Sequence, residues 1–204
     1  SGLLGATALA ILRDRHEVYG CYREHPIELS RCKTMPLDVT DRSALFAALN
    51  QIKPDVILHT AAATNIEWCE ENKKEATRIN VHATQYLSAY CNQSGAKLIH
   101  ISTDAFFDRP GKISESETPR PVNYYGQTKF EAEVEALRCS RVLIARTNIY
   151  GWNYQKKMSL AEWMLHHFGN GKRAPLFNDV HYTPLLTNTL VDLLDRLEGA
   201  EVGG

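Results

Sequence analysis

The sequence predicts an α/β fold built on a doubly wound parallel sheet, and three observations lead to that class. Short apolar runs of strand length recur along the chain. Segments of helical period separate them, and strands alternating with helices join by right-handed crossovers into a parallel sheet covered on both faces. The 204 residues, 44% of them hydrophobic, suffice for one sizeable core. A disordered, collagen-like or small disulfide-based protein is excluded.

The predicted strands are runs of apolar and β-branched residues. They are expected at 17–22, 55–60, 97–102 and 141–147. The run 55–60 is nearly all apolar, as a centrally placed parallel strand should be. A further short strand is expected just before Leu37.

The predicted helices fill the intervals between these strands. They are expected at 3–13, at 42–52 behind a capping Asp41, over a long stretch from 66 to 93, at 160–168 and at 187–197. Residues 104–123 have neither helical nor strand period, and they predict one long surface loop. Loops of that length inside compact domains are usually functional.

Charge and composition narrow the function classes. Lys and Arg total 23 against 24 Asp and Glu, so the net charge of -1 offers no basic surface for a nucleic acid. No apolar run reaches the length of a membrane span and no signal segment opens the chain, so a cytoplasmic protein is expected. The five cysteines include no C-x-x-C pair and read as reduced, mostly buried thiols, and no metal ligands are expected.

The chain begins with a glycine-containing turn that enters a helix at once. This is how the phosphate turn of a dinucleotide-binding, Rossmann-type βαβ unit looks when its preceding strand is absent, so we expect that strand to be missing from the chain as given. Gly2 would let the backbone approach a pyrophosphate, and the free N–H groups at Leu3 and Leu4 would hold the phosphate charge. The alternative is a flexible chain start.

The strand at 17–22 should end beside the adenosine ribose of such a cofactor. Arg23 follows it directly and suits the extra 2′-phosphate of NADP, so NADP(H) is favoured and NAD(H) remains an alternative. Arg23 could equally be a solvated surface charge. After the next short strand, Asp38 and the adjoining Val39 are candidates to meet the adenine, and the alternative for Asp38 is a turn residue.

The candidate catalytic groups are Thr103 at a strand end and the pair Tyr125 and Lys129 at a helix start. Residues four apart share a helix face, and an adjacent ammonium should lower the tyrosine pKa from about 10. Tyr125 could then protonate a ketone oxygen while hydride reaches the carbon, with Thr103 hydrogen-bonded to the same oxygen. The Y-x-x-x-K spacing alone is nearly uninformative, but its order after the strand-end hydroxyl and the nucleotide-type start gives it weight.

With these motifs the chain resembles the extended short-chain dehydrogenase/reductases, and within them the dTDP-4-dehydrorhamnose reductase group. The resemblance covers nearly the whole chain. It rests on Gly2-Leu-Leu-Gly5, Asp55-Val-Ile-Leu-His-Thr-Ala-Ala-Ala-Thr64, Cys69-Glu70, Ile79-Asn80, Ser102-Thr103-Asp104, Tyr125-x-x-x-Lys129 and Arg146-Thr-Asn-Ile-Tyr-Gly151.

The resemblance implies roles for individual residues. Thr103 would be the catalytic hydroxyl, Tyr125 the proton donor and Lys129 the lysine that lowers its pKa and binds the ribose. Ala61, Ala62 and Ala63 would line the cofactor, where small side chains admit the dinucleotide. Asn80 matches the family's helix asparagine, with a buried structural amide as the alternative. Contacts to substrate or nicotinamide are expected from Thr64, Asn148 and Tyr150.

The resemblance also implies a domain division. Residues 1–150 would form the NAD(P)-binding domain, and 151–204 part of a small, incomplete substrate-binding lobe. The segment 178–186 departs from the family pattern, which leaves the particular sugar open.

The function expected on these grounds is an NADPH-preferring reductase of a nucleotide-linked 4-keto-6-deoxy sugar, with hydride delivered to C4. One alternative is a sugar-nucleotide epimerase or dehydratase, and Ala105 after Asp104 argues against the dehydratase, which usually carries an acidic pair there. The other is a non-catalytic NADP-binding partner resembling the regulatory subunit of methionine adenosyltransferase. A homodimer is the family expectation.

Overall fold

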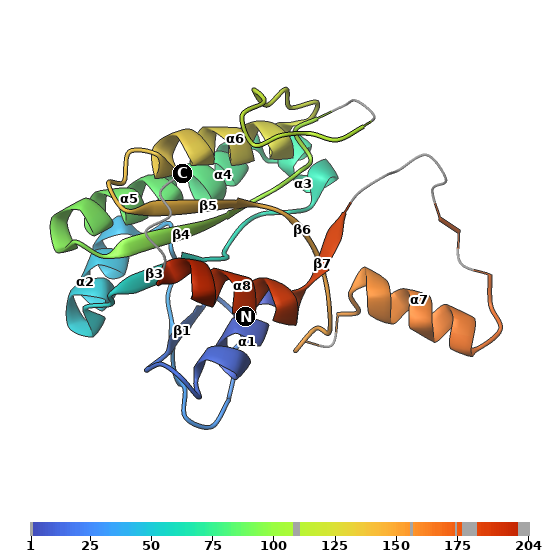
Figure 1. Cartoon of the computed structure of the whole chain (residues 1–204), viewed down its shortest axis with the longest axis horizontal. Coiled ribbons are helices and arrows are strands. Elements are labelled where there is room, and N and C mark those ends of the chain that lie inside the picture. The colour runs from blue at the N-terminus through green and yellow to red at the C-terminus, as the bar shows by residue number, and fades with distance from the viewer. Residues whose placement is uncertain (1, 108–110, 156, 174, 177–182, 200–204) are drawn as a thin grey trace. The chain divides into compact units, whose positions relative to one another are not determined.

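The computed structural model describes residues 2–107, 111–155, 157–173, 175–176 and 183–199 (Figure 1). It confirms the α/β class, because helices and strands alternate and all the described strand pairs are parallel. The described residues of 1–37 and 148–201 form one compact unit, and those of 38–147 form the other. The predicted domain boundary at residue 150 stays a prediction.

The unit 38–147 is built on a three-stranded parallel sheet. Its strand order is β3 (Val56–His59), β4 (Lys97–Ser102) and β5 (Val142–Arg146). Strand β4 lies in the middle and is almost fully buried, as expected for a central parallel strand. Two helices, α5 (Ala83–Ser94) and α6 (Tyr124–Ala136), pack against it (Figure 1).

Helix α2 (Arg42–Ile52) begins as the sequence predicts. The Asp41 side chain caps it by accepting a hydrogen bond from the Ala44 backbone N–H at 3.0 Å. The helix ends at Lys53, which adopts the left-handed conformation. Its buried leucines, Leu45 and Leu49, belong to the core of this unit.

The long helical stretch predicted from 66 to 93 is interrupted. Helix α3 (Ile66–Glu71) stops at Asn72, whose side chain donates to the Trp68 carbonyl at 3.0 Å. The chain then continues as α4 (Lys73–Thr77), a π-helical turn η1 (Arg78–His82) and α5 without a further break. Side-chain hydrogen bonds at Asn72 compete with the helix ladder, which is why periodicity alone misses the break.

The loop that follows β4 is anchored in its described part. Phe106 is fully buried, and its carbonyl accepts the Arg120 backbone N–H at 3.0 Å. Arg146 at the end of β5 binds the Glu133 carboxylate through two guanidinium nitrogens at 3.0 and 2.8 Å, and it also donates to the Glu115 carbonyl. These contacts tie the loop to α6, the helix that carries the candidate tyrosine and lysine.

The other unit holds two pairs of short parallel strands. Strand β1 (Tyr19–Tyr22) pairs with β2 (Lys33–Pro36), and β6 (Asn148–Tyr150) pairs with β7 (Pro184–Leu186).

Three helices complete this unit: α1 (Leu3–Leu12), α7 (Leu160–Gly169) and α8 (Thr187–Glu198). Helix α1 packs along α8. Gly151 is required at the end of β6, because a Cβ there would lie 2.4 Å from the Thr187 hydroxyl oxygen.

Helix α7 differs from the other long helices. A complete capping box at Ser159 and Glu162 starts it. None of its residues is buried, and Leu165 and Phe168 are more than half exposed.

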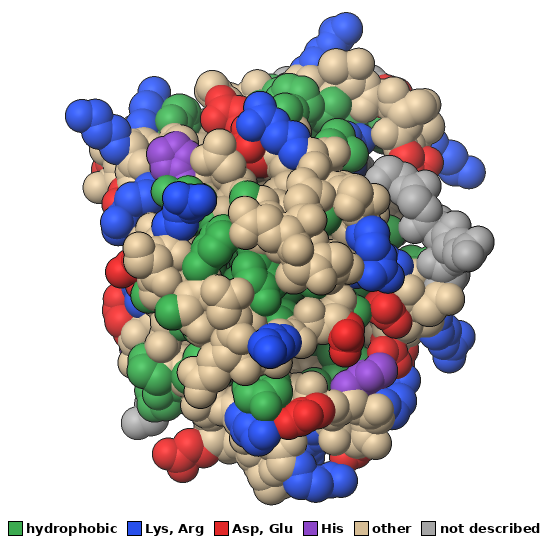
Figure 2. Space-filling view, turned by 90° about the vertical axis from the view of Figure 1, so that its left-hand side faces the viewer, with side chains coloured by type: hydrophobic (Ala, Val, Ile, Leu, Met, Phe, Trp, Pro, Cys, Tyr) green, Lys and Arg blue, Asp and Glu red, His purple; other side chains and the backbone are tan. Residues whose placement is uncertain are grey.

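Surface charge is mixed, as the composition predicts. On the face shown in Figure 2, Lys and Arg side chains are interspersed with Asp and Glu. Among the described helices, none is both long and apolar enough to cross a membrane. Of the five cysteines, Cys69, Cys91 and Cys139 are buried thiols.

Candidate active site

The structure brings the three candidate catalytic residues together at the carboxyl end of β4. Thr103 follows the strand and is almost fully buried, and its hydroxyl accepts the Ala105 backbone N–H at 3.1 Å. Asn123 caps α6 by accepting the Gly126 N–H at 2.7 Å, which places Tyr125 in the first turn. The Thr103 side chain lies close enough to Tyr125 to act on its pKa, which it lowers.

Lys129 lies one turn further along α6 and is 3% exposed. Its ammonium donates to the Ile101 carbonyl at 2.7 Å and lies 3.5 Å from the His100 Nε2 atom. Burial disfavours the charged form and lowers the pKa of Lys129 to about 8, although the Glu133 carboxylate opposes that effect. Lys129 is therefore mostly charged at neutral pH and titrates just above it.

The pKa of Tyr125 differs from the sequence expectation. Burial raises it above the usual value, and the hydrogen bond from Thr103 offsets only part of that rise. The Lys129 ammonium is directed to the Ile101 carbonyl and His100. Tyr125 is thus a protonated phenol at neutral pH, which is the form a proton donor needs.

Asn80 braces this site from behind. It is 1% exposed, its Oδ1 accepts the Ala63 backbone N–H at 2.8 Å, and its Nδ2 donates to the Ala63 carbonyl at 3.1 Å and to the Thr128 hydroxyl at 2.9 Å. The loop after β3, which contains Ala61 to Thr64, is therefore fixed to α6. These partners of the Asn80 side chain are all structural, which favours the buried-amide alternative.

A second brace, which the sequence reasoning missed, holds the start of α6. The Glu70 carboxylate accepts the Tyr124 backbone N–H at 2.6 Å, and the Tyr124 hydroxyl lies 2.8 Å from that of Thr77. The Lys73 ammonium stands over the Tyr124 ring at 5.1 Å from its centre. The only signal in the sequence was Glu70 itself, within the Cys69-Glu70 motif.

Two buried histidines also escaped the sequence reasoning. His59 and His100 are paired in register on β3 and β4, with ring centres 5.6 Å apart. Burial lowers the pKa of His59 to about 3 and also lowers that of His100, so both rings are neutral. Their signal was a histidine among the leucine and isoleucine residues of each strand.

The predicted phosphate turn lies in the other unit, at the start of α1. Gly2 is its N-cap residue, no side chain caps the helix, and no acidic residue stands in its first turn. The space where a Cβ of Gly2 would project is open. The helix start that includes Leu3 and Leu4 therefore fits a phosphate group, because in the described part of the chain no side chain caps it.

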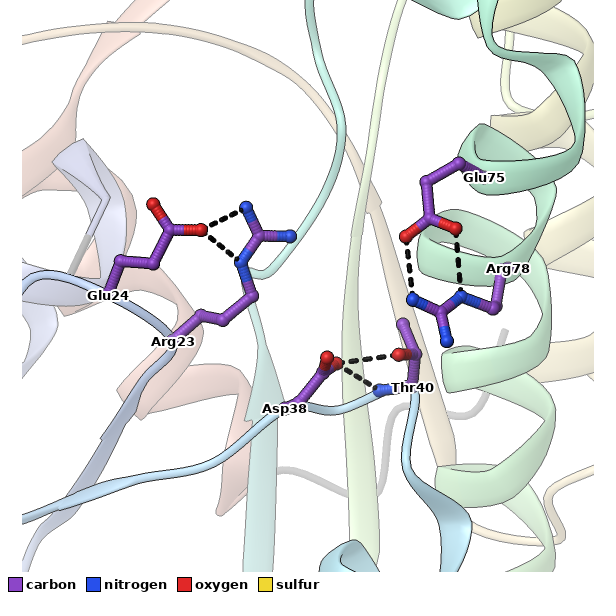
Figure 3. A network of polar contacts seen from close by, with 6 residues as sticks. All are labelled: Arg23, Glu24, Asp38, Thr40, Glu75 and Arg78. Atoms are coloured by element: carbon purple, nitrogen blue, oxygen red, sulfur yellow. Dashed lines mark hydrogen bonds and ion pairs between the residues drawn. The ribbon is translucent and has the colours of Figure 1, made fainter.

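The candidates for the adenosine end form local pairs (Figure 3). Arg23 is exposed and binds the carboxylate of its neighbour Glu24 at 2.7 Å. Asp38 accepts hydrogen bonds from the Thr40 N–H and hydroxyl at 2.9 and 2.7 Å, which is the turn role left open by the sequence. Val39 lies within that turn and is partly exposed.

Figure 3 also shows a pair from the π-helical turn. Arg78 binds Glu75 through two nitrogens at 2.9 and 2.8 Å. Asp38 contributes to the raised pKa of Arg78.

The remaining substrate candidates are less enclosed. Thr64 is exposed in the loop after β3. Asn148 and Tyr150 stand at the two ends of β6, and Tyr150 is 42% exposed. Residues 178–182 of the divergent segment lie outside the described part of the chain.

Comparison with sequence families and curated proteins gives consistent results. The family model described as the RmlD substrate binding domain matches residues 1–201. A probable low-salt glycan biosynthesis reductase, Agl14, of Haloferax volcanii is 29% identical over 96% of this chain and 68% of its own length. A dTDP-4-dehydrorhamnose reductase of Aggregatibacter actinomycetemcomitans is 31% identical over 77% of this chain and 53% of its own. The chain thus spans about half of that reductase.

One relative carries a different name. Methionine adenosyltransferase 2 subunit beta of Danio rerio is 32% identical over 73% of this chain and 45% of its own length. Both kinds of protein anticipated from the motifs are therefore similar to this chain.

Solved structures extend the comparison to the fold. A hypothetical dTDP-4-dehydrorhamnose reductase from Sulfolobus tokodaii superposes with a TM-score of 0.88 and 31% identity, covering 99% of this chain and 71% of that one. The Bacillus anthracis dTDP-4-dehydrorhamnose reductase, solved in complex with NADP, has a TM-score of 0.75 and 26% identity, covering 87% and 66%. With the family model matching nearly all of its length, the chain belongs to the RmlD substrate binding domain family, among the extended short-chain dehydrogenase/reductases.

Proposed function

We propose that the protein is an NADPH-preferring reductase of a nucleotide-linked 4-keto-6-deoxy sugar. The observation that carries the proposal is the placement of Thr103 at the end of β4 beside the start of α6, where Tyr125 and the buried Lys129 lie one helical turn apart. A phenol held beside a second hydroxyl can donate a proton to a carbonyl oxygen while that hydroxyl keeps the oxygen in place. The relatives named as dTDP-4-dehydrorhamnose reductases support the substrate class.

The residues act as follows in this proposal. Tyr125 donates its proton to the C4 oxygen, and Thr103 donates a hydrogen bond to the same atom. Lys129 remains charged and stabilises the phenolate that Tyr125 becomes. Asn80 acts only through the loop and helix that it joins. A bound reduced nicotinamide supplies the hydride to C4.

The binding roles follow the same proposal. The start of α1, with Gly2, Leu3 and Leu4, would hold the pyrophosphate, and Ala61, Ala62 and Ala63 would line the dinucleotide. Arg23 would meet the 2′-phosphate, since its exposed pair with Glu24 contributes little and exchanges readily for a dianion. Asp38 and Val39 would lie at the adenine, and Thr64, Asn148 and Tyr150 at the substrate or nicotinamide. The homodimer remains a prediction.

The test follows NADPH absorbance in the full-length protein on addition of dTDP-4-keto-6-deoxyglucose and dTDP-4-dehydrorhamnose. Tyr125→Phe should lower kcat by about 100-fold or more, because a positioned acid contributes that much. Tyr86→Phe, a change on α5, is the matched control and should retain activity.

The alternative function is a regulatory, NADP-binding subunit. The similarity to methionine adenosyltransferase 2 subunit beta supports it. NADPH that binds tightly but is not oxidised by any 4-keto-6-deoxy sugar nucleotide would refute the reductase. A change in the activity of an added methionine adenosyltransferase would then establish the regulatory role.

A further inference from the structure

A row of buried titratable groups crosses the sheet beneath the candidate active site. His59 on β3 is 5% exposed, His100 on β4 is 0% exposed, and Lys129 on α6 is 3% exposed. The two rings are register partners, and the Nε2 atom of His100 lies 3.5 Å from the Lys129 ammonium. The proton transfer proposed above uses neither histidine.

Burying polar ring nitrogens that make no hydrogen bond lowers the stability of the fold, so these two histidines call for an explanation. The His100 Nδ1 and His59 Nε2 atoms are buried and have no hydrogen-bond partner among the described residues. An apolar side chain at either position would avoid that cost, since neighbouring strand positions hold leucine and isoleucine. The one nitrogen of His100 with a polar neighbour is the one that faces Lys129.

The hydrogen-bond chemistry assigns the tautomer of His100. A lysine ammonium has three donors and no acceptor, so the facing nitrogen must carry a lone pair. His100 is neutral, which makes Nε2 the acceptor and puts the ring proton on Nδ1. A second N–H of the ammonium donates a hydrogen bond to the Ile101 carbonyl, with 2.7 Å between nitrogen and oxygen. The third N–H of Lys129 is not used by these two contacts.

We propose that His100 is a positioning residue for Lys129, whose neutral Nε2 atom holds the ammonium jointly with the Ile101 carbonyl so that its third N–H serves the reaction side. The assignment of a reaction side rests on the proposed reductase function. The contact between the imidazole and the ammonium does not, because it is present in the protein alone.

Other charged groups near Lys129 act separately from His100. Glu133, on the same helix, favours the ammonium, and Arg146 from β5 binds that carboxylate. Asp104 and Cys69 act on Tyr125 instead. Among the described residues no hydrogen bond joins His59 on β3 to Lys129, and the neutral His59 ring contributes no charge. A change at His100 should therefore alter the titration of Lys129 through the hydrogen bond.

The test reads the Lys129 titration directly by NMR, in the full-length protein labelled with ¹³C at the lysine ε-carbon. The Lys129 signal is assigned by its loss in Lys129→Met, and its wild-type midpoint is expected at about 8. His100→Leu removes the acceptor and should lower the midpoint by about half a unit to one unit, the size of a weak hydrogen bond to a charged group. His100→Gln supplies another acceptor and should restore most of the shift.

The matched control is His59→Leu, which removes the same residue type from the adjoining strand and should leave the midpoint in place. His100→Met is a second apolar variant in case the leucine does not fit, and thermal unfolding confirms that each variant is folded. Equal Lys129 midpoints in the wild-type protein and in a folded His100→Leu or His100→Met protein would overturn the proposal.

Activity provides a second, separable readout. If the reductase function holds, the alkaline limb of the kcat/KM profile should move to lower pH in His100→Leu and return in His100→Gln. Absence of any keto-sugar reduction would count against the proposed function alone, because the NMR titration needs no substrate.

Discussion

The polar contacts around α6 and the pairs of Figure 3 differ in how far apart in sequence their partners lie. Around α6, contacts join residues far apart in sequence, such as Asn80 with Ala63 and Thr128, and Lys129 with Ile101. The pairs of Figure 3 are local, such as the exposed Arg23 with Glu24 and the partly buried Asp38 with Thr40. Proton transfer requires fixed geometry, which long-range buried contacts provide, whereas recognition of a charged phosphate tolerates mobile side chains.

The largest expected effect is at Asn80. Asn80→Leu leaves the Ala63 N–H without its acceptor and removes the hydrogen bonds from Asn80 to the Ala63 carbonyl and the Thr128 hydroxyl, so the free energy of unfolding should fall by about 3 kcal/mol. Urea denaturation measures the change. The control Asn92→Leu also removes two backbone contacts, but at an exposed site, and should cost less than about 1 kcal/mol. Equal decreases in the free energy of unfolding of the two variants would show that burial does not make the Asn80 contacts more stabilising than those of Asn92.

The next effect is expected at the Glu133–Arg146 ion pair. Glu133 is 3% exposed, so Glu133→Gln should destabilise the protein by about 2–3 kcal/mol by leaving the Arg146 guanidinium poorly compensated. Glu135→Gln on the same helix breaks a pair whose arginine is 63% exposed and should cost at most about 1 kcal/mol. The midpoints of thermal unfolding of the two variants compare them directly.

Acid should lower the free energy of unfolding, because His59 and His100 are buried as neutral rings. The pKa of His59 is about 3 in the folded state against 6.5 as the reference, so the unfolded chain binds more protons between those values. The contribution of the neutral ring to the free energy of unfolding is therefore fully present above about pH 6.5. It is lost as the pH falls below that value, by about 1.4 kcal/mol per pH unit for each such histidine. His59→Leu should reduce this slope in urea denaturation, whereas the exposed His25→Gln should not. An unchanged slope in His59→Leu would contradict the neutral, buried assignment.

The smallest effect on stability is expected at Arg23. Arg23→Ala breaks an exposed pair and should leave the unfolding midpoint unchanged, yet lower the selectivity for NADPH over NADH by about tenfold. Ratios of kcat/KM for the two cofactors in the full-length protein measure this. Arg138→Ala, which removes another exposed arginine, should leave the ratio unchanged. A retained preference in Arg23→Ala would assign the 2′-phosphate to another residue.

The parts of the fold that depend on local pattern were predictable. Residues 97–102 form the predicted strand, and 42–52 form the predicted helix behind Asp41. The placement of Thr103, Tyr125 and Lys129 was predictable, because strand-end and helix-start positions follow from element order, and their catalytic roles stay predictions.

Features that depend on distant partners were not predictable. The break at Asn72 goes with a side-chain contact that a periodic pattern does not contain, and the pattern also gives no sign of the π-helical turn that follows. The raised pKa of Tyr125 reflects burial, and burial is a property of the assembled unit. The three-residue strands β6 and β7 are too short to show a period.

The π-helical turn η1 determines how the continuous helical segment from α4 to α5 responds to a change in its length. A π turn holds one residue more than an α-helical turn, and each residue of an α-helix rotates the chain by about 100°. Deleting one residue of η1 other than Asn80 would therefore leave an α-helical turn in its place, and α5 would keep its rotation relative to α4. The buried face of α5, with Leu87 and Cys91, would stay in the core. A one-residue deletion within α5 itself has no such turn to absorb it and would rotate the residues beyond it by about 100°.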